Sequence, residues 1–350
     1  MSLVAVNKLV SAKVSRLRQL SANLRRSGRV TCSPTVLNIE TTTACNHRCV
    51  TCPRTHINPP VRQMPMDLFT RIIEQSHRDI DFVHLYLLGE PLLDTDLVER
   101  IGLCTRFGLA THIATNASLL DEKRTKALLE AGLSAITFTI STTRPDIYRR
   151  LHGEAHYGRV IRNVENFLFM KRRMRAPVHV TIQIIRNPAT LGEVGAVANR
   201  WRSEPGINSI KITQDEFGYI GRCYDDDRLW AQATNEVCIH LWQGPLYVSV
   251  DGGYFPCRIS ALSADPMANA RDMSPREFWT GAAMAKLREN HMEGILDDWL
   301  DCANCPVPKP IPSLCYLSYL ASAWDARLLG ITLERFAFLH NWRIQSREII

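Results

Sequence analysis

Apolar, β-branched runs alternate with helix-like stretches over the first two thirds of the chain. Six runs predict strands, at residues 36–41, 81–87, 109–114, 135–140, 178–184 and 209–213. Stretches with apolar residues at helical spacing lie between them, at 66–79, 94–107, 121–131, 158–174 and 190–202. This alternation predicts a parallel sheet with its crossover helices outside, either an open sheet or an incomplete barrel. In such folds the chemistry lies at the carboxyl ends of the strands.

The N-terminal segment, residues 1–35, has an unusual charge balance. It contains no Asp or Glu, and the net charge of +7 comes from its basic residues, so the rest of the chain is balanced and is not a basic nucleic-acid-binding domain. Apolar residues recur in it at helical spacing: Val10, Val14, Leu17, Leu20 and Leu24. We expect an amphipathic helix whose stripe packs on the main domain, with a membrane surface, an acidic partner or organelle targeting as alternatives.

The chain has eleven cysteines, too many for thiols that only fill a core. No stretch approaches the roughly 18 unbroken apolar residues of a membrane-spanning helix, and the basic N-terminus is unlike an export signal. We therefore expect a cytoplasmic protein whose thiols stay reduced, and metal binding explains the cysteines better than disulfides do.

Three of the cysteines, Cys45, Cys49 and Cys52, follow the first predicted strand on one loop. Three such closely spaced thiolates can bind one soft metal centre, but they supply one ligand fewer than a closed four-thiolate cluster needs. In such a cluster one iron would have no protein ligand. A structural zinc site completed by His47 or His56 is the alternative.

The Cys45-x3-Cys49-x2-Cys52 spacing resembles the cluster motif of the radical S-adenosylmethionine (SAM) superfamily. The resemblance implies a partial (β/α)6 TIM-like barrel with a [4Fe–4S] cluster whose open iron binds SAM. It implies that an electron from this cluster cleaves SAM to a 5′-deoxyadenosyl radical. It also implies an external one-electron reductant such as flavodoxin or ferredoxin.

Further segments at the strand ends carry the same resemblance. Leu88-Gly89-Glu90-Pro91 is similar to the family's Gly-Gly-Glu-Pro, with Leu88 in place of the first glycine, and Thr115-Asn116-Ala117 resembles its Thr-Asn-Gly. The residues that would contact SAM lie at or near the ends of four strands after the first: Gly89, Glu90, Pro91, Asn116, Ser141, Thr143, Gln183 and Asn187. Glu90 would hold the methionine ammonium, and Ser141 or Thr143 the carboxylate or the ribose.

Each of these side chains also has a purely structural interpretation. Glu90 before Pro91 fits a turn residue, and Asn116 fits a turn or a helix cap. Ser141 or Thr143 fits the N-cap of a helix near Asp146.

A second cysteine group begins beyond residue 225, where the β–α rhythm ends. Cys238, Cys257 and the pair Cys302 and Cys305 supply four thiolates, and residues 248–257 predict a hairpin with an Asp-Gly turn. In isolation a zinc ribbon would be the default. In this context the order of Cys, Gly-x4-Cys and CxxC resembles the twitch cap, a shortened SPASM extension, and implies one auxiliary [4Fe–4S] cluster. Cys315 would be a spare ligand.

The resemblance to twitch-bearing dehydrogenases implies oxidation of a small polar metabolite, a sugar or cyclitol alcohol, with the auxiliary cluster taking up an electron. Arg258 would orient a hydroxyl, and Asp215 or Glu216 would act as the base. A radical epimerase using the Cys223 or Cys315 thiol and a peptide-modifying enzyme are alternatives. A zinc protein or RNA-binding module is the alternative from another class.

The expected organisation has four parts. A basic amphipathic helix occupies residues 1–35, the radical SAM barrel 36–225, the twitch-like domain 226–315 and a helical segment 316–350. The remaining cysteines, Cys32, Cys104 and Cys223, are expected to be buried or incidental thiols.

Overall fold

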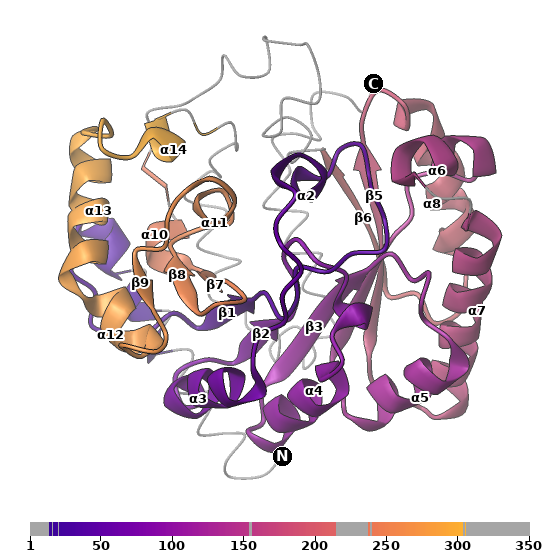
Figure 1. The fold of residues 1–350 in the computed structure, drawn as a ribbon, viewed down its shortest axis with the longest axis horizontal. Coiled ribbons are helices and arrows are strands. Elements are labelled where there is room, and N and C mark those ends of the chain that lie inside the picture. The colour runs from indigo at the N-terminus through magenta and orange to yellow at the C-terminus, as the bar shows by residue number, and fades with distance from the viewer. Residues whose placement is uncertain are drawn as a thin grey trace. The chain divides into compact units, whose positions relative to one another are not determined.

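The computed structural model describes residues 14–303 and 305, apart from 16, 20, 154–155, 215–236 and 239. Strands alternate with helices as far as residue 214 (Figure 1). The first elements are β1 (Val36–Ile39), α2 (Pro53–Ile57), α3 (Met66–Ser76), β2 (Phe82–His84), the 3-10 helix η1 (Pro91–Leu93), α4 (Leu97–Arg106), β3 (Ala110–Thr115) and α5 (Glu122–Glu130). They are followed by β4 (Ala135–Thr139), α6 (Pro145–His152), α7 (Tyr157–Arg173), β5 (His179–Arg186), η2 (Leu191–Glu193), α8 (Val194–Arg202) and β6 (Ser209–Gln214).

The later part of the chain has short elements apart from the helix α13 (Ala282–Glu293). They are α10 (His240–Gln243), β7 (Leu246–Val248), β8 (Gly253–Phe255), α11 (Ser260–Ser263), β9 (Ala268–Asn269), α12 (Pro275–Thr280), α13 (Ala282–Glu293) and α14 (Leu300–Ala303). The predicted hairpin is present, because β7 and β8 pair antiparallel. Its turn contains Gly252 at φ +89°, a backbone conformation that favours glycine.

All six predicted strands and the five predicted helical stretches are present, with ends that differ by a few residues. The predicted mixed α/β class with parallel strands is confirmed. The sequence analysis missed α2, a five-residue helix that begins at Pro53 directly after Cys52.

The chain divides into two compact units. The described residues of the first unit are 14–39, 67–83 and 237–305, and those of the second unit are 40–66 and 84–214. Each unit is described by itself below.

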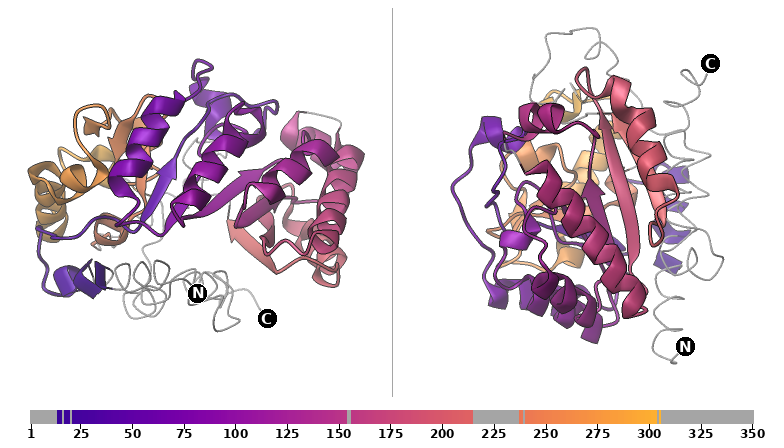
Figure 2. Two further views of the ribbon diagram at one scale, coloured as in Figure 1. Left: turned by 90° about the horizontal axis from the view of Figure 1, so that it is seen from below. Right: turned by 90° about the vertical axis from the view of Figure 1, so that its right-hand side faces the viewer.

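In the second unit, β3, β4, β5 and β6 form a parallel sheet in that order. One face is apolar and buried, with Ile113, Ile136, Phe138 and Val180 on neighbouring strands. Helices α4 to α8 lie along this side of the strands (Figures 1 and 2), and Phe167 of α7 contacts Phe138 with ring centroids 5.4 Å apart. Burial of this apolar face is the main force that holds the helices on the sheet.

The opposite face of the same sheet is polar. Side chains alternate along each strand, so it carries residues of the other parity: His112, Thr137, His179, Thr181, Gln183, Ser209 and Lys211. A polar face on central parallel strands is expected only where the sheet borders a site. The polar residues at the strand ends and those on this face of the sheet therefore form one polar surface.

In the first unit, β1 pairs parallel with β7, and β8 and β9 follow antiparallel. The core beside these strands contains Trp242, Trp279 and the fully buried Arg288. The Arg288 guanidinium donates to three backbone carbonyls, those of Leu241, Gly28 and Trp279. These bonds satisfy the buried cation and join Gly28 to the helices α10, α12 and α13.

The N-terminal helix differs from its prediction. The described residues between 14 and 24 are helical, but Val14, Leu17 and Leu24 of the predicted apolar stripe are exposed. The buried side chains are polar, and Gln19 Nε2 donates to Ser33 O at 2.7 Å. The expected packing of the stripe on the main domain is therefore wrong for these three side chains.

Across the described residues we find no helix with both the length and the apolar character that crossing a bilayer requires.

Candidate cluster and cofactor site

The three cysteines of the first motif lie close together on the loop after β1. Burial is the main cause that raises the pKa of the Cys49 thiol, and the charges of Cys52, Cys45 and Glu90 raise it further. The pKa of Cys45 is raised for the same reasons. The loop thus brings three thiols and one carboxylate into electrostatic contact.

The loop is attached to the carboxyl end of α6 by its backbone. The Arg48 N–H donates to His152 O at 3.3 Å, and the Val50 N–H donates to Leu151 O at 2.9 Å. These bonds satisfy carbonyls that a helix end leaves without intrahelical partners. Gly153 ends the helix at φ +68°, and a Cβ there would lie 3.3 Å from Arg48 O. Cys49 is therefore held on both sides by backbone bonds.

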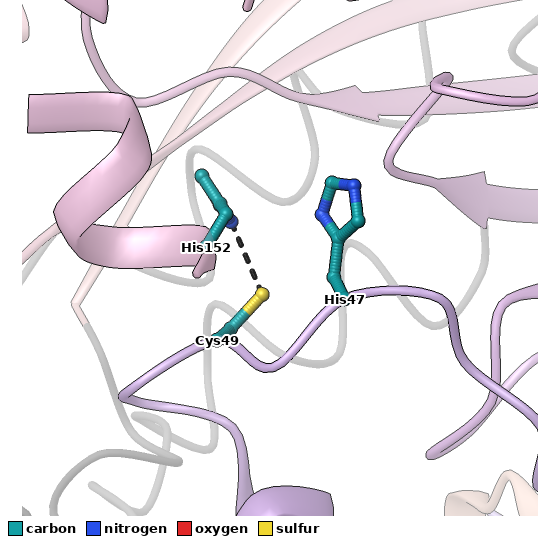
Figure 3. Close-up of side chains that lie close together, drawn as sticks. All are labelled: His47, Cys49 and His152. Atoms are coloured by element: carbon teal, nitrogen blue, oxygen red, sulfur yellow. Dashed lines mark hydrogen bonds between the residues drawn. The ribbon is translucent and has the colours of Figure 1, made fainter. Parts of the chain in front are cut away.

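Two histidines lie beside Cys49 (Figure 3). Cys49 Sγ is 3.1 Å from His152 Nδ1, and the ligand atoms of His47, Cys49 and His152 all lie within 4.8 Å of one another. Burial lowers the pKa of His152 to about 3, with a smaller contribution from His47, so the imidazole is neutral. Of the alternative zinc site, the structure brings His47 next to Cys49 but not into one group with Cys45 and Cys52, and His56 is exposed on α2.

The segment 88–91 lies directly against the cluster loop. A Cβ on Gly89 would lie 2.0 Å from Thr42 O, so only glycine fits, and the Glu90 N–H donates to Ala44 O at 2.7 Å. The Leu88 N–H donates to Glu40 Oε1 at 3.2 Å. The sequence analysis did not single out Glu40. A glutamate at the end of an apolar strand is nevertheless a signal of a buried hydrogen-bond acceptor.

The Glu90 carboxylate is buried and accepts three hydrogen bonds. Thr115 Oγ1 donates to Oε1 at 2.5 Å, the Leu92 N–H to Oε1 at 3.1 Å and the Asn116 N–H to Oε2 at 2.9 Å. Burial raises the pKa of Glu90, and these donors oppose that rise because they favour the charged form. An ionised carboxylate has lone pairs for further donors, so these bonds leave it able to accept from a ligand ammonium.

The Asn116 side chain is used in a turn network that joins the end of β3 to the cluster loop. Its Nδ2 donates to Asn46 Oδ1 at 3.0 Å, its Oδ1 accepts from Ser118, and Asn46 Nδ2 donates to Ser118 Oγ at 2.8 Å. This is the turn role that the sequence left as the alternative. A cofactor contact from Asn116 stays a prediction.

The hydroxyls after β4 contact other strand ends. Ser141 Oγ accepts from the Ile185 N–H at 3.0 Å. Glu193 Oε2 accepts from Thr142 Oγ1, the Thr143 N–H and Thr143 Oγ1, at 3.0–3.1 Å. These bonds lower the pKa of Glu193.

The alternative N-cap role for Ser141 or Thr143 is wrong, because α6 has Arg144 at its N-cap without a side-chain cap bond. Glu193 was missed because it lies 50 residues from Thr143 along the chain.

After β5, Asn187 is buried and its Oδ1 accepts from the Ala189 and Thr190 N–H groups, which makes it a turn residue. Gln183 lies on the polar face of the sheet, and its Nε2 donates to Thr213 Oγ1 at 3.1 Å. Pro91 begins η1 and is buried. Cofactor contacts by these three residues stay predictions.

A pair of histidines on the polar face was not singled out in the sequence. His84 Nδ1 is 2.9 Å from His112 Nδ1, and His112 Nε2 is 2.8 Å from Thr137 Oγ1. Burial lowers the pKa of His84 to about 3, and the charge of Lys211 lowers it further. Burial is also the main cause that lowers the pKa of His112. The sequence signal that could have found this pair is a histidine at an inward-facing position on each of two neighbouring strands.

The second cysteine set lies in the first unit, and its members also influence one another. Cys257 follows β8, Cys238 precedes α10, and Cys302 and Cys305 lie on and just after α14. Burial raises the pKa of Cys257, and the charges of Cys238, Cys302 and Cys305 raise it further. The described structure therefore brings the four predicted ligands together.

The spacing of these sulfur atoms bears on the metal they fit. Within the described part of the chain, the His47, Cys49 and His152 group is the one set of three or more possible ligands within 4.8 Å of one another, so no three of the four thiols meet that limit. Thiolates on one tetrahedral zinc ion lie about 3.8 Å apart, given a Zn–S distance of about 2.3 Å. Which metal or cluster these four thiols would hold stays a prediction.

Arg258, next to Cys257, is half-buried. Asp215, Glu216, Cys223 and Cys315 lie outside the described residues, so the predicted base and spare thiols stay predictions.

Comparisons with known proteins agree with the cysteine motif. Residues 39–173 match the Radical SAM superfamily. An uncharacterized protein of Methanocaldococcus jannaschii is 30% identical over 129 residues, which cover 37% of this chain and 42% of that protein. The chain spans between 30% and 42% of the length of the curated relatives it matches.

Two solved structures show a similar fold. BtrN in complex with AdoMet and 2-DOIA has a TM-score of 0.51 at 18% identity, over 77% of this chain and 92% of BtrN. Streptococcus suis SuiB bound to S-adenosylmethionine has a TM-score of 0.59 at 15% identity, over 85% of this chain and 77% of SuiB.

Residues 39–173 thus form a radical SAM domain, the fold is consistent with the partial barrel of that superfamily, and the resemblance predicted from the first cysteine motif is confirmed.

Proposed function

We propose that this protein is a radical SAM enzyme that holds a [4Fe–4S] cluster at Cys45, Cys49 and Cys52 and abstracts a hydrogen atom from a small polar metabolite. A sugar or cyclitol alcohol is the substrate class, and oxidation is the outcome. An external one-electron carrier such as flavodoxin or ferredoxin is the reductant.

The observation that carries the proposal is the contact between the cluster loop and Gly89-Glu90. Gly89 lies against Thr42, the Glu90 N–H donates to Ala44 O, and the Glu90 charge acts on Cys45 and Cys49. A buried carboxylate beside three thiols, with no room for a side chain at Gly89, fits a cluster with a ligand amine next to it. When bound, such a cluster supplies the electron that cleaves SAM reductively.

The chain's own residues have separate tasks in this proposal. Three thiolates leave one iron without a protein ligand, and Glu90 accepts the hydrogen bonds of the methionine ammonium. The Thr115 Oγ1 and Asn116 N–H donors favour the ionised form of Glu90 and fix the orientation of its carboxylate. Ser141, Thr143 and Gln183 border the remainder of the cofactor.

The second cysteine set supports oxidation as the outcome. Cys238, Cys257, Cys302 and Cys305 would hold an auxiliary cluster with no open iron, and such a cluster can accept the second electron of the oxidation. Arg258 lies next to this site in sequence and would orient the substrate hydroxyl. Asp215 or Glu216 would remove the proton.

A peptide-modifying enzyme is the second candidate. SuiB bound to its precursor peptide SuiA has a TM-score of 0.57 to this chain over 85% of its length. This value exceeds the 0.51 of BtrN, although both likenesses concern the fold. Epimerisation is the third candidate reaction, and an isomeric product would distinguish it from oxidation.

The test uses the anaerobically reconstituted full chain with dithionite and SAM. The variant with Cys45, Cys49 and Cys52 changed to Ala is expected to keep about half of the iron and to form no 5′-deoxyadenosine, whereas Cys104→Ala, a buried thiol on α4, should behave like the wild type. Cofactor cleavage by the triple variant would refute the proposal. With a substrate in hand, loss of two hydrogens indicates a dehydrogenase, and an isomeric product indicates an epimerase.

A further inference from the structure

The outer side of the cluster loop carries large apolar side chains that are open to solvent. Val50, Ile57 and Val61 are 49%, 45% and 71% exposed. All three lie within twelve residues of the cluster ligands Cys49 and Cys52. Exposed apolar residues gathered on one segment are typical of an interaction site.

Local hydrogen bonds hold the segment that carries these residues in a folded conformation. Thr55 Oγ1 of α2 donates to Cys49 O at 2.9 Å, and His56 Nε2 lies 3.4 Å from Val50 O. The segment then returns along residues 42–43, where the Thr43 N–H donates to Arg62 O at 3.0 Å. The apolar side chains therefore belong to a folded loop and not to a free tail.

The charged side chains of the loop itself have one sign. Residues 41–66 contain Arg48, Arg54 and Arg62 and no Asp or Glu. Arg48 and Arg62 are exposed. The neighbouring helix α6, to which the loop is bonded, adds exposed Arg149 and Arg150.

The acid on α6 is exposed Asp146, which forms ion pairs with Arg144 at 2.8 Å and Arg150 at 3.8 Å. It offsets part of the charge of α6, but the loop itself stays basic.

We propose that this surface, Val50, Ile57 and Val61 with Arg48, Arg62, Arg149 and Arg150 around them, is the docking site for an acidic electron-carrier protein of the flavodoxin or ferredoxin type. The inference rests on the proposed function, because the partner must deliver an electron to the cluster at Cys45, Cys49 and Cys52. Apolar side chains surrounded by charges of one sign fit a partner with the opposite charge, which gains in association rate and in orientation.

The position of the surface fits this partner better than other occupants. Cys49 and Cys52 are part of the same loop, so a protein that covers Val50 lies over two of the cluster ligands. In the transfer, one electron leaves the reduced carrier and enters the oxidised cluster, with no bond made or broken between the proteins. The flavin of a flavodoxin goes from hydroquinone to semiquinone, and the cluster of a ferredoxin is oxidised by one electron. A transient electron-transfer contact needs only a small interface.

The test compares two double variants with the same change in charge. Arg48→Glu/Arg149→Glu changes the proposed surface, and Arg173→Glu/Arg202→Glu changes exposed residues at the ends of α7 and α8. Binding of an acidic flavodoxin to each full chain is measured by fluorescence at low and at 0.15 M salt. 5′-Deoxyadenosine formation is then measured with reduced flavodoxin and, separately, with dithionite.

We expect the surface pair to weaken flavodoxin binding by at least about tenfold and to lower flavodoxin-driven cleavage in parallel, with the dithionite-driven rate unchanged. Val61→Asp should weaken binding as well, because it places a charge in the apolar contact. Equal weakening by the control pair, or no flavodoxin binding by the wild type, would overturn the inference. A dimer of this chain that Val61→Asp dissociates would also overturn it. Failure of the wild type to cleave SAM with dithionite would instead refute the proposed function, and the binding comparison would still test the surface.

Discussion

Gly89 and Thr42 are in such close contact that position 89 has no room for a side chain, since a Cβ would lie 2.0 Å from the Thr42 carbonyl oxygen. We expect Gly89→Ala to displace the loop before Cys45 and to lower the iron bound at the first motif by half or more. The measurement is iron per chain after reconstitution, together with SAM-dependent changes in the electron paramagnetic resonance spectrum. Gly195→Ala on α8, where no atom lies within 4 Å of the added Cβ, is the control and should bind iron normally. Normal iron binding by Gly89→Ala would contradict the assigned contact.

The second prediction concerns the buried ion pair of Arg100 and Asp94. Arg100 Nε lies 2.8 Å from Asp94 Oδ2, both side chains are fully buried, and Arg100 also donates to Met64 O. Arg100→Met leaves the Asp94 charge without its partner, so we expect the free energy of unfolding to fall by about 3–5 kcal/mol. The free energy of unfolding is measured from the unfolding transition of the second unit in urea.

Arg124→Met is the control for this loss, because it breaks the exposed pair of Arg124 with Asp121. Its effect should stay below about 1 kcal/mol. Similar losses in the two variants would show that the buried pair is not special.

The third prediction is a loss of stability in acid. The pKa of His84 is about 3 in the folded protein, below its ordinary value of 6.5, so the unfolded chain takes up a proton that the folded chain does not. The contribution of His84 is therefore complete above pH 6.5 and falls as the pH drops from 6.5 toward 3. A second proton would also place two N–H groups against each other in the His84–His112 contact.

We expect His84→Asn to lose less stability than the wild type between pH 7 and pH 4.5, by about 2 kcal/mol, in urea denaturation. The exposed His56→Asn should follow the wild type. An unchanged pH dependence in His84→Asn would show that other groups account for the acid sensitivity.

The fourth prediction concerns the 3.1 Å contact between Cys49 Sγ and His152 Nδ1. A thiolate that binds iron has no hydrogen, so His152 must be the donor in the loaded protein, and a hydrogen bond to a ligand sulfur favours the reduced cluster. His152→Leu should lower the ratio of reduced to oxidised cluster at a fixed potential by about fivefold, the equivalent of one ordinary hydrogen bond.

His152→Asn is the matched variant, because its amide nitrogen can take the place of Nδ1 as donor. This variant should restore most of the lost ratio of reduced to oxidised cluster. Equal titration curves for the leucine variant and the wild type would remove this role from His152.

The fifth prediction separates the two cysteine sets. Cys257→Ser should remove about half of the iron and leave dithionite-driven cleavage of SAM intact, because Cys257 belongs to the first unit and Cys45, Cys49 and Cys52 to the second. Cys104→Ser should leave the iron content unchanged. Two equivalents of zinc in purified wild type, with no iron, would contradict both cluster assignments.

The fold was largely predictable because its signals are local. Strands such as β4 and β5 appear as continuous β-branched runs, and helices such as α7 have apolar residues at helical spacing. The short helix α2 carries too few residues for periodicity to show, and it follows the cysteine loop directly.

The site was predictable only where motifs name its residues. Cys45 and Gly89 belong to recognisable segments, but nothing local marks Glu193, which accepts from Thr142 and Thr143 some 50 residues away. The His84–His112 contact likewise depends on which strands become neighbours and in which register. Such roles arise from tertiary structure, and one sequence does not encode them as a pattern.

The backbone bonds from Arg48 and Val50 to the end of α6 do not involve the metal. Small zinc domains fold only when they bind the ion, whereas here main-chain hydrogen bonds that need no metal hold the loop to α6. Oxygen that destroys the inorganic core would therefore leave an intact receptor behind. Copies of the enzyme inactivated in air would be restored by fresh iron and sulfide under reducing conditions, and would not need to be degraded and synthesised again.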